Sequence, residues 1–383
     1  MPDRQSPSTE SRLTIGFLRR GYSPTGGVEA YLKGLAEGLN REGHRVILLG
    51  TKEWPVEEWP GGEILRCKGK NLSDYSAEVA RQKSFSGVRF DLILSVEKVP
   101  GCDIYRTDEG LHAAWLAQRA HYISAWARLF QRISPKHREK LRLEKELFTP
   151  SATRRVISLS HKISGEICSL YGYPKSQVSI IRNGVPSRSV TTPWERSLAR
   201  RELGIPENEK VVLFVGTGWE RKGLRFAIHA VESLKDPNVR LLVAGKGPTK
   251  RYVSPSVRFL GGVVKMAMVY DAADIFLFPT LFDPFPLATL EALSAGLPVI
   301  TTSANGVSEI MTPGIHGEVI AEPSDIGALR TALSRWIANL EVPATSTQIR
   351  FTCSALASEF TLERNLRETL AVIRQVISER NES

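Results

Sequence analysis

The amino-acid sequence predicts an α/β protein made of two parallel-sheet domains. Short apolar runs alternate with segments of helical periodicity from residue 13 to residue 302, as in parallel strands joined by crossover helices. This alternation stops once, in a polar stretch with two prolines and no periodicity at residues 185–197, and then restarts. A chain of 383 residues is also longer than one hydrophobic core usually organises. Two Rossmann-like domains joined by a linker at 185–197 account for all three observations.

The first domain is expected to span residues 13–187. Its predicted strands are the short apolar runs at 13–18, 45–50, 91–96, 156–160 and 178–185. After the first strand, one helix face carries Val28, Leu32, Leu35 and Leu39. Residues 1–12 are polar and lack the apolar region of a signal peptide, so we expect a flexible tail.

The second domain is expected over residues 188–354, where the same alternation recurs. Its predicted strands lie at 211–216, 239–245, 274–280 and 298–302, with helices at 223–234, 265–273 and 288–296. A last helix within 355–383 has one apolar face, formed by Leu362, Leu366, Leu370, Ile373 and Ile377. We expect this helix to cross back and pack toward the first domain.

The composition is that of an ordinary soluble globular protein, with 42% hydrophobic and 24% charged residues. The four cysteines show no metal-ligand spacing, which favours free thiols in a reducing compartment. No apolar run approaches the roughly 18 residues that a membrane-spanning helix needs. These observations predict a cytoplasmic protein.

The formal net charge of +10 is concentrated in one segment. Eight lysines and arginines lie between residues 119 and 145, against three glutamates up to residue 146, so this stretch alone carries +5. Segment 112–148 also has an apolar stripe near helical spacing, formed by Trp115, Tyr122, Trp126, Leu129, Phe130 and Ile133. The pattern predicts either an amphipathic helix on an anionic membrane or a helix packed on the first domain. No nucleic-acid motif accompanies the charge, so no nucleic-acid partner is expected.

Two glycine-containing loops could bind an anion. Ligands of such sheets lie beyond the carboxyl ends of the strands, where a glycine loop meets a helix N-terminus. Gly26 and Gly27 follow the first strand, and Arg221 and Lys222 lie in the loop Gly216–Gly223 after strand 211–216. Two cations at a helix N-terminus oppose the helix dipole, so a bound phosphate group would complete the second loop. A tight turn and a solvated surface pair are the alternatives for these two loops.

A third candidate lies in residues 278–302, where two carboxylates are eight positions apart. Asp283 ends a strand-to-helix loop, and Glu291 lies in an otherwise apolar helix, where a carboxylate needs a partner. Both are suited to binding the hydroxyl groups of one extended ligand. The alternative for Glu291 is a solvent-exposed position.

This third stretch resembles glycosyltransferase family 4, whose members have the GT-B fold. The motif is an acidic residue, seven spacers and a glutamate before A-x-A-x-G-x-P-V, here Asp283 to Glu291 followed by ALSAGLPVI. Other matching pieces are PTGGVEAYLKGL, VGTGWERKG, VAGKGP, YDAADIFLFPT and SANGVSEI. The piece VPGCDIYRTDEGLHAAWL at 99–116 is similar to the lipopolysaccharide core glucosyltransferases.

The resemblance implies a retaining, metal-independent transfer of a hexose from a nucleotide sugar, such as UDP-glucose, to a lipopolysaccharide-core or similar glycolipid acceptor. The donor site it implies comprises Gly26, Gly27, Arg221, Lys222, Asp283, Leu287 and Glu291. An acid near the anomeric carbon would come from Glu109 or Asp108, with Asp283 on the donor sugar. His112 is a candidate on the acceptor side, or a packed residue. No cofactor is expected, and a glycolipid acceptor favours peripheral attachment to the inner face of the cytoplasmic membrane.

Two departures from the family pattern bear on the donor. The first acid of the motif is the shorter Asp283 in place of glutamate, and the loop around Val263 lacks the arginine that would border the base. Two other functions remain as alternatives to transfer: a non-hydrolysing sugar-nucleotide epimerase, and a membrane- or nucleic-acid-binding protein on a Rossmann scaffold.

Overall fold

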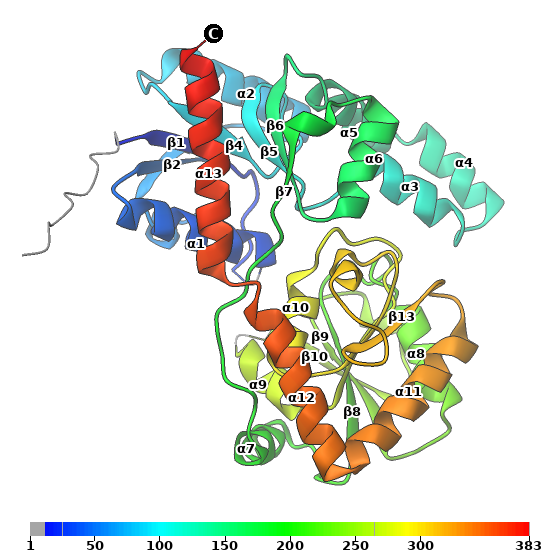
Figure 1. Cartoon of the computed structure of the whole chain (residues 1–383). Helices are drawn as coiled ribbons and strands as arrows, with labels where there is room; N and C mark the ends of the chain where they lie inside the picture. The colour runs from blue at the N-terminus through cyan, green and yellow to red at the C-terminus, as the bar shows by residue number, and fades with distance from the viewer. Residues whose placement is uncertain (1–11, 25, 264, 383) are drawn as a thin grey trace, which may run out of the picture.

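The computed structural model describes residues 12–24, 26–263 and 265–382. Within these ranges the chain forms two parallel sheets, one in each domain (Figure 1). The first sheet has the strand order β3-β2-β1-β4-β5-β6-β7, and the second has the order β10-β9-β8-β11-β12-β13. The predicted fold class, two Rossmann-like α/β domains, is therefore confirmed.

The described residues of the N-terminal domain form the first seven strands and six α-helices. The strands are β1 (Thr14–Leu18), β2 (Arg45–Gly50), β3 (Glu63–Arg66), β4 (Leu92–Ser95), β5 (Cys102–Arg106), β6 (Thr153–Ser158) and β7 (Val178–Ile180). The helices are α1 (Gly27–Arg41), α2 (Leu72–Phe85), α3 (His112–Ala120), α4 (Ala125–Ile133), α5 (Pro135–Leu147) and α6 (His161–Tyr171). The central strands are buried on both faces, as parallel strands between helices must be.

The C-terminal domain repeats this plan. Its strands are β8 (Lys210–Val215), β9 (Val239–Ala244), β10 (Val257–Gly261), β11 (Ile275–Phe278), β12 (Val299–Thr302) and β13 (Gly317–Ile320). Its helices are α7 (Pro193–Leu203), α8 (Leu224–Ser233), α9 (Met266–Ala272), α10 (Leu287–Ser294), α11 (Ile326–Glu341) and α12 (Pro343–Ser358). The last helix, α13 (Leu362–Asn381), lies against the N-terminal domain (Figure 1).

Four strands were not predicted, and three of them are at the edges of the sheets. β3, β10 and β13 are edge strands whose side chains are mostly half-buried, so their sequences lack a continuous apolar run. The fourth, β5, is central but reads CDIYR. Periodicity is a weak signal for strands of both kinds.

The predicted linker at 185–197 is too long at its C-terminal end. The hydroxyl of Thr192 accepts a hydrogen bond from the Glu195 backbone, and the Glu195 carboxylate accepts one from the Thr192 backbone. This capping box starts α7 at Pro193, inside the expected linker. The sequence TPWE carries the signal for it.

Two segments connect the domains, and they run side by side. Val185, on the way to the C-terminal domain, forms a parallel bridge with Thr361, where the chain returns. A side chain at Gly184 would lie 2.2 Å from the Thr361 carbonyl oxygen, so only glycine allows this approach. After Thr361, α13 packs on α1, and the Tyr31 hydroxyl donates a hydrogen bond of 2.9 Å to Asn365. Residues 355–358 of the expected last helix instead end α12, which packs on α10.

The basic segment 112–148 is three helices and not one amphipathic helix. Trp115, on α3, and Tyr122, between α3 and α4, pack against the hydrophobic cores. The apolar side chains of α4 are exposed, with Trp126 74% and Phe130 65% accessible. The predicted stripe is therefore divided between core contacts and a solvent-facing helix.

Among the described residues, no helix is both long and apolar enough to cross a membrane.

Candidate functional site

The loop before α8 holds two cations against one acid of the loop after β11. Lys222 Nζ donates to Asp283 Oδ2 at 2.9 Å, and Arg221 Nη1 donates to the same oxygen at 3.0 Å. Arg221 also donates to the Phe282 carbonyl at 2.7 Å. Burial raises the pKa of Asp283, but Lys222 and Arg221 outweigh that effect and hold the pKa below its usual value. Asp283 is therefore an ionised carboxylate shared by two cations.

Glycines allow these side chains to approach the backbone. Gly216 has a φ of 141°, and a side chain there would lie 2.7 Å from Lys222 Cδ. Gly223 has a φ of 78°, and its added Cβ would lie 1.9 Å from the Pro279 carbonyl oxygen. Burial lowers the pKa of Lys222, and the carboxylate of Asp283 opposes that change. The loop thus holds a desolvated ammonium group where the carboxyl ends of β8 and β11 meet.

Glu291 lies on α10, one helical turn past its first residue Leu287, and has its own partner. Its Oε2 accepts a hydrogen bond of 2.7 Å from the Tyr270 hydroxyl. Burial raises the pKa of Glu291, and the hydrogen bond from Tyr270 opposes it. Glu291 is half-buried, so it is not the fully exposed helix position of the alternative interpretation. Tyr270, on α9, was not among the predicted site residues.

The two predicted glycines of the first domain lie at the start of α1, opposite the C-terminal domain. A Cβ on Gly27 would lie 3.4 Å from Cδ1 of Leu287, which begins α10. A Cβ on Gly26 would lie 1.9 Å from Glu29 Oε2. Two helix N-termini therefore face each other across the domain boundary, and both present backbone amides and dipoles that favour an anion.

Asp108 and Glu109 are neighbours with different environments. Asp108 forms a buried ion pair with Arg106, whose other terminal nitrogen donates to Asn183 at 2.5 Å. Burial raises the pKa of Asp108, and Arg106 opposes it. Glu109 is 54% exposed. The sequence left the choice between the two acids open, and the structure gives Asp108 a packing partner and leaves Glu109 accessible.

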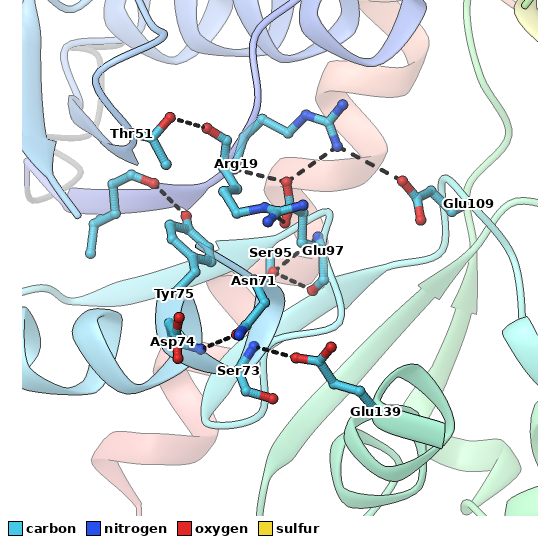
Figure 2. A network of polar contacts seen from close by, with 12 residues as sticks. Arg19, Thr51, Asn71, Ser73, Asp74, Tyr75, Ser95, Glu97, Glu109 and Glu139 are labelled. Carbon is cyan, nitrogen blue, oxygen red and sulfur yellow. Dashed lines mark hydrogen bonds and ion pairs between the residues drawn. The ribbon is translucent and has the colours of Figure 1, made fainter. Parts of the chain in front are cut away.

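Glu109 belongs to a charged network at the carboxyl end of the first sheet. Figure 2 shows Arg19 between Glu97 and Glu109, at 3.3 and 4.0 Å. Arg19 also contacts Glu29 of α1 at 2.8 Å. Desolvation raises the pKa of Glu109, but Lys98, Lys140, Arg19 and Arg221 together hold it below its usual value. Arg19, Glu97 and Lys98 were not predicted as site residues, although each follows a predicted strand at its carboxyl end.

Glu109 and Asp283 are brought together by contacts between the domains. Gly110 has a φ of 65°, and a side chain there would lie 2.6 Å from Phe282 and 2.8 Å from Pro284. Asn183 donates from Nδ2 to the Phe285 carbonyl at 2.6 Å. The loops that carry the two acids are therefore packed directly against each other.

His112 faces another histidine. Its Nε2 lies 3.0 Å from Nδ1 of His137, and its backbone amide donates to the buried Glu144. Burial, followed by the charges of Lys140 and Lys98, lowers the pKa of His112 to about 3. The side chain is therefore neutral at pH 7, and it lies at the start of α3, directly after the Glu109–Gly110 loop.

Among the described residues, no cluster of three or more His, Cys, Asp or Glu side chains could hold a metal ion.

Two family models match the chain, one in each domain. A model described as glycosyltransferase family 4 matches residues 25–188, and one described as glycosyl transferases group 1 matches residues 209–339. Relatives of similar length align with most of the chain. An uncharacterized glycosyltransferase of Methanocaldococcus jannaschii is 27% identical over 335 residues, which cover 80% of this chain and 84% of that protein. The lipopolysaccharide glucosyltransferase WaaG of Escherichia coli is 25% identical over 329 residues, which cover 81% and 86%.

Solved structures share the arrangement of both domains. The crystal structure of WaaG superposes with a TM-score of 0.79 at 22% identity, covering 94% of this chain and 99% of WaaG. Anabaena HepE, solved with UDP and glucose, superposes with a TM-score of 0.70 at 18% identity, covering 95% and 100%. The two facing Rossmann-like domains and the matches of both to transferase models define a GT-B glycosyltransferase. The chain belongs to glycosyltransferase family 4 and resembles the lipopolysaccharide core glucosyltransferases.

Proposed function

We propose that this protein transfers a hexose from a UDP-sugar, such as UDP-glucose, to a lipopolysaccharide-core or similar glycolipid acceptor, with retention and without a metal ion. The observation that carries the donor part is the pairing of Arg221 and Lys222 with Asp283 beside two facing helix N-termini. A diphosphate placed there meets two cations and the backbone amides of α1 and α10. The structures of HepE with UDP and glucose and with UDP-glucose support this choice of donor.

The cations supply the chemistry that a metal ion supplies in other transferases. Negative charge accumulates on the departing diphosphate as the bond to the sugar breaks, and pre-placed cations stabilise that charge. Displaced from Lys222 and Arg221 by the diphosphate, Asp283 becomes free to accept hydrogen bonds from sugar hydroxyls. We assign the ribose hydroxyls to Glu291 and to the Tyr270 hydroxyl that is hydrogen-bonded to it.

Glu109 is the acid that we assign to the acceptor side of the transfer. It is accessible, ionised at neutral pH, and close enough to Arg221 for that charge to lower its pKa. An ionised carboxylate there can stabilise an oxocarbenium-like sugar or take the acceptor proton. We assign a hydrogen bond to the acceptor to His112, which is neutral and next to the same loop.

We assign peripheral membrane attachment to α4 and the basic residues around it. Trp126, Leu129, Phe130 and Ile133 are exposed on one short helix, and Arg128 and Arg132 lie on the same helix. Aromatic residues with flanking cations suit the headgroup region of an anionic membrane. A glycolipid acceptor requires the site to reach such a surface. This attachment would place the protein on the inner face of the cytoplasmic membrane.

A transfer assay with several nucleotide sugars tests the proposed function. We expect a UDP-hexose to be consumed with a glycolipid acceptor, the product to keep the anomeric configuration of the donor, and activity to persist in a chelator. Inversion at the anomeric carbon, or strict dependence on a divalent ion, would contradict the proposal. Conversion of the donor into another nucleotide sugar without any acceptor would favour an epimerase over a transferase.

A further inference from the structure

A pocket lies at the amino ends of the central strands of the C-terminal sheet. It has a volume of about 480 Å³, within the range typical of small-molecule sites. Lys210 and Ile275, which begin β8 and β11, line it together with the first turns of α7 and α12. The donor cluster described above follows the carboxyl ends of these same strands. The pocket and the donor site therefore lie at opposite ends of these strands.

The interior of this pocket has more positive than negative charge. Asp274 is contacted by three guanidinium groups: Arg196, Arg200 at 2.7 Å and Arg350 at 3.8 Å. All four side chains are at most 23% exposed. The other carboxylate that lines the pocket, Glu207, is more than half exposed and so compensates little. One buried guanidinium, Arg200, and two partly buried ones, Arg196 and Arg350, thus share one buried carboxylate, an arrangement that is costly unless a further anion completes it.

Arg200 and Arg350 have different roles. Arg200 donates to four backbone carbonyls as well as to Asp274, so all its terminal donors serve the fold. Arg350, on α12, lines the pocket, and its buried Nη1 has no hydrogen-bond partner among the described residues. A buried, unpaired donor on an ionised group requires an explanation. Burial also lowers the pKa of Arg350, and the Asp274 carboxylate opposes that change.

We propose that this pocket binds a small organic phosphate, with Arg350 and Arg196 as its main ligands. A guanidinium fork matches the geometry of phosphate oxygens and can bind them bidentately. The N-termini of α7 and α12 add partial positive charge, and α12 has no side-chain cap. Apolar side chains, Val211, Ile275, Ile337 and Leu340 among them, suit the carbon frame of the ligand.

The two helices that line the pocket adjoin the two crossings between the domains. α7 is the first helix after the outward crossing, and α12 is the last before the return crossing at Thr361. Figure 1 shows α7 and the start of α12 at the end of the C-terminal domain remote from the N-terminal domain. A ligand held by Arg196 and Arg350 ties these two helices together.

Calorimetry with the full chain tests the proposal, with a nucleoside monophosphate, a hexose phosphate and inorganic phosphate as probes. Saturating UDP is present throughout, so that the donor site is filled. We expect at least one organic phosphate to bind with one-to-one stoichiometry, and Arg350→Gln to weaken it at least tenfold. Arg330→Gln, at an exposed position of α11, is the matched control and should bind as the wild type does. Ser346→Trp fills the pocket without changing its charge and should also abolish binding.

Two outcomes would overturn the assignment: no probe binds to the UDP-saturated protein, or binding survives both Arg350→Gln and Ser346→Trp. A melting curve checks that the variants fold. Since Arg350 lacks a full partner, Arg350→Gln without ligand should melt no lower than wild type. A large fall in the melting temperature of Arg350→Gln would show that Arg350 serves only to neutralise the charge of Asp274.

Discussion

Lys222 and Asp283 are joined by a hydrogen bond of 2.9 Å that connects the loop after β8 to the loop after β11. The same carboxylate oxygen accepts from Arg221 at 3.0 Å, so one acid neutralises both cations of the proposed diphosphate site. A diphosphate that binds these cations must compete with Asp283 for them. Under the proposed function, the acid is then released to bind the donor sugar.

Replacing Lys222 with Gln should weaken UDP binding. A charge-assisted hydrogen bond contributes about 1.5–3 kcal/mol, which corresponds to a loss in affinity of roughly ten- to hundredfold. Calorimetry with UDP measures this loss in affinity. The matched control is Lys235→Gln, at an exposed position beyond the other end of α8, which should change nothing. Equal affinities for wild type and Lys222→Gln would remove Lys222 from the donor site.

Replacing Asp283 with Asn should separate diphosphate binding from transfer. The variant lacks the competing charge, so we expect UDP to bind at least as tightly as it does to wild type. Transfer should fall, because the amide is a weaker acceptor for sugar hydroxyls. Binding and turnover are measured on the same preparation. If UDP affinity falls as far as in Lys222→Gln, then Asp283 acts by positioning the cations and not by binding sugar.

Glu109→Gln should lower transfer activity, whereas Asp108→Asn should lower the free energy of unfolding. Glu109 is accessible, so its replacement should lower transfer and leave the free energy of unfolding unchanged. Asp108→Asn leaves the buried Arg106 without its counter-charge, and breaking a buried pair costs about 3–5 kcal/mol. Urea unfolding and a transfer assay distinguish the two. A Glu109→Gln variant with full activity would exclude Glu109 as the acid of the site.

His112 should make the protein less stable at acidic pH. Its pKa is about 3 in the folded chain and about 6.5 when unfolded, so between these values only the unfolded chain binds the proton. The stability contribution of this residue is therefore lost as the pH falls below 6.5. Melting temperatures at pH 7.5 and pH 5 should differ less in His112→Gln than in wild type. His229→Gln, at an exposed position of α8, should keep the wild-type difference.

Trp126 and Phe130 should be needed for binding to anionic vesicles. Replacing both with Ser removes the exposed apolar side chains of α4 without touching the core, whereas Trp115 is partly packed inside. We expect wild type to float with anionic vesicles at low salt and the double variant to remain unbound. Trp194→Ser, which removes an exposed tryptophan of α7, should float as wild type does. Failure of the wild type to bind anionic vesicles would exclude membrane attachment through α4.

The sequence by itself determined the two-domain α/β plan and the loops that carry the candidate residues. Buried parallel strands need continuous apolar runs, and the turns after them need glycine, so both leave a local signal near Gly216 and Gly223. The edge strand β3 left no such signal, because an edge is only partly buried. The start of α7 did leave one, the capping box from Thr192 to Glu195, which the periodicity did not show.

Only the tertiary structure decided which of these residues meet. Asp108 and Glu109 are adjacent in sequence, yet Asp108 forms a buried ion pair with Arg106 and Glu109 remains accessible. Arg19, Glu97 and Arg350 have no motif around them, and their environments depend on strands and helices distant in the chain. Burial and charge pairing are long-range properties, since they depend on which side chains the fold brings within a few ångströms. A pattern of neighbouring residues therefore predicts elements and loops, and the packing of both domains sets the charges of the site.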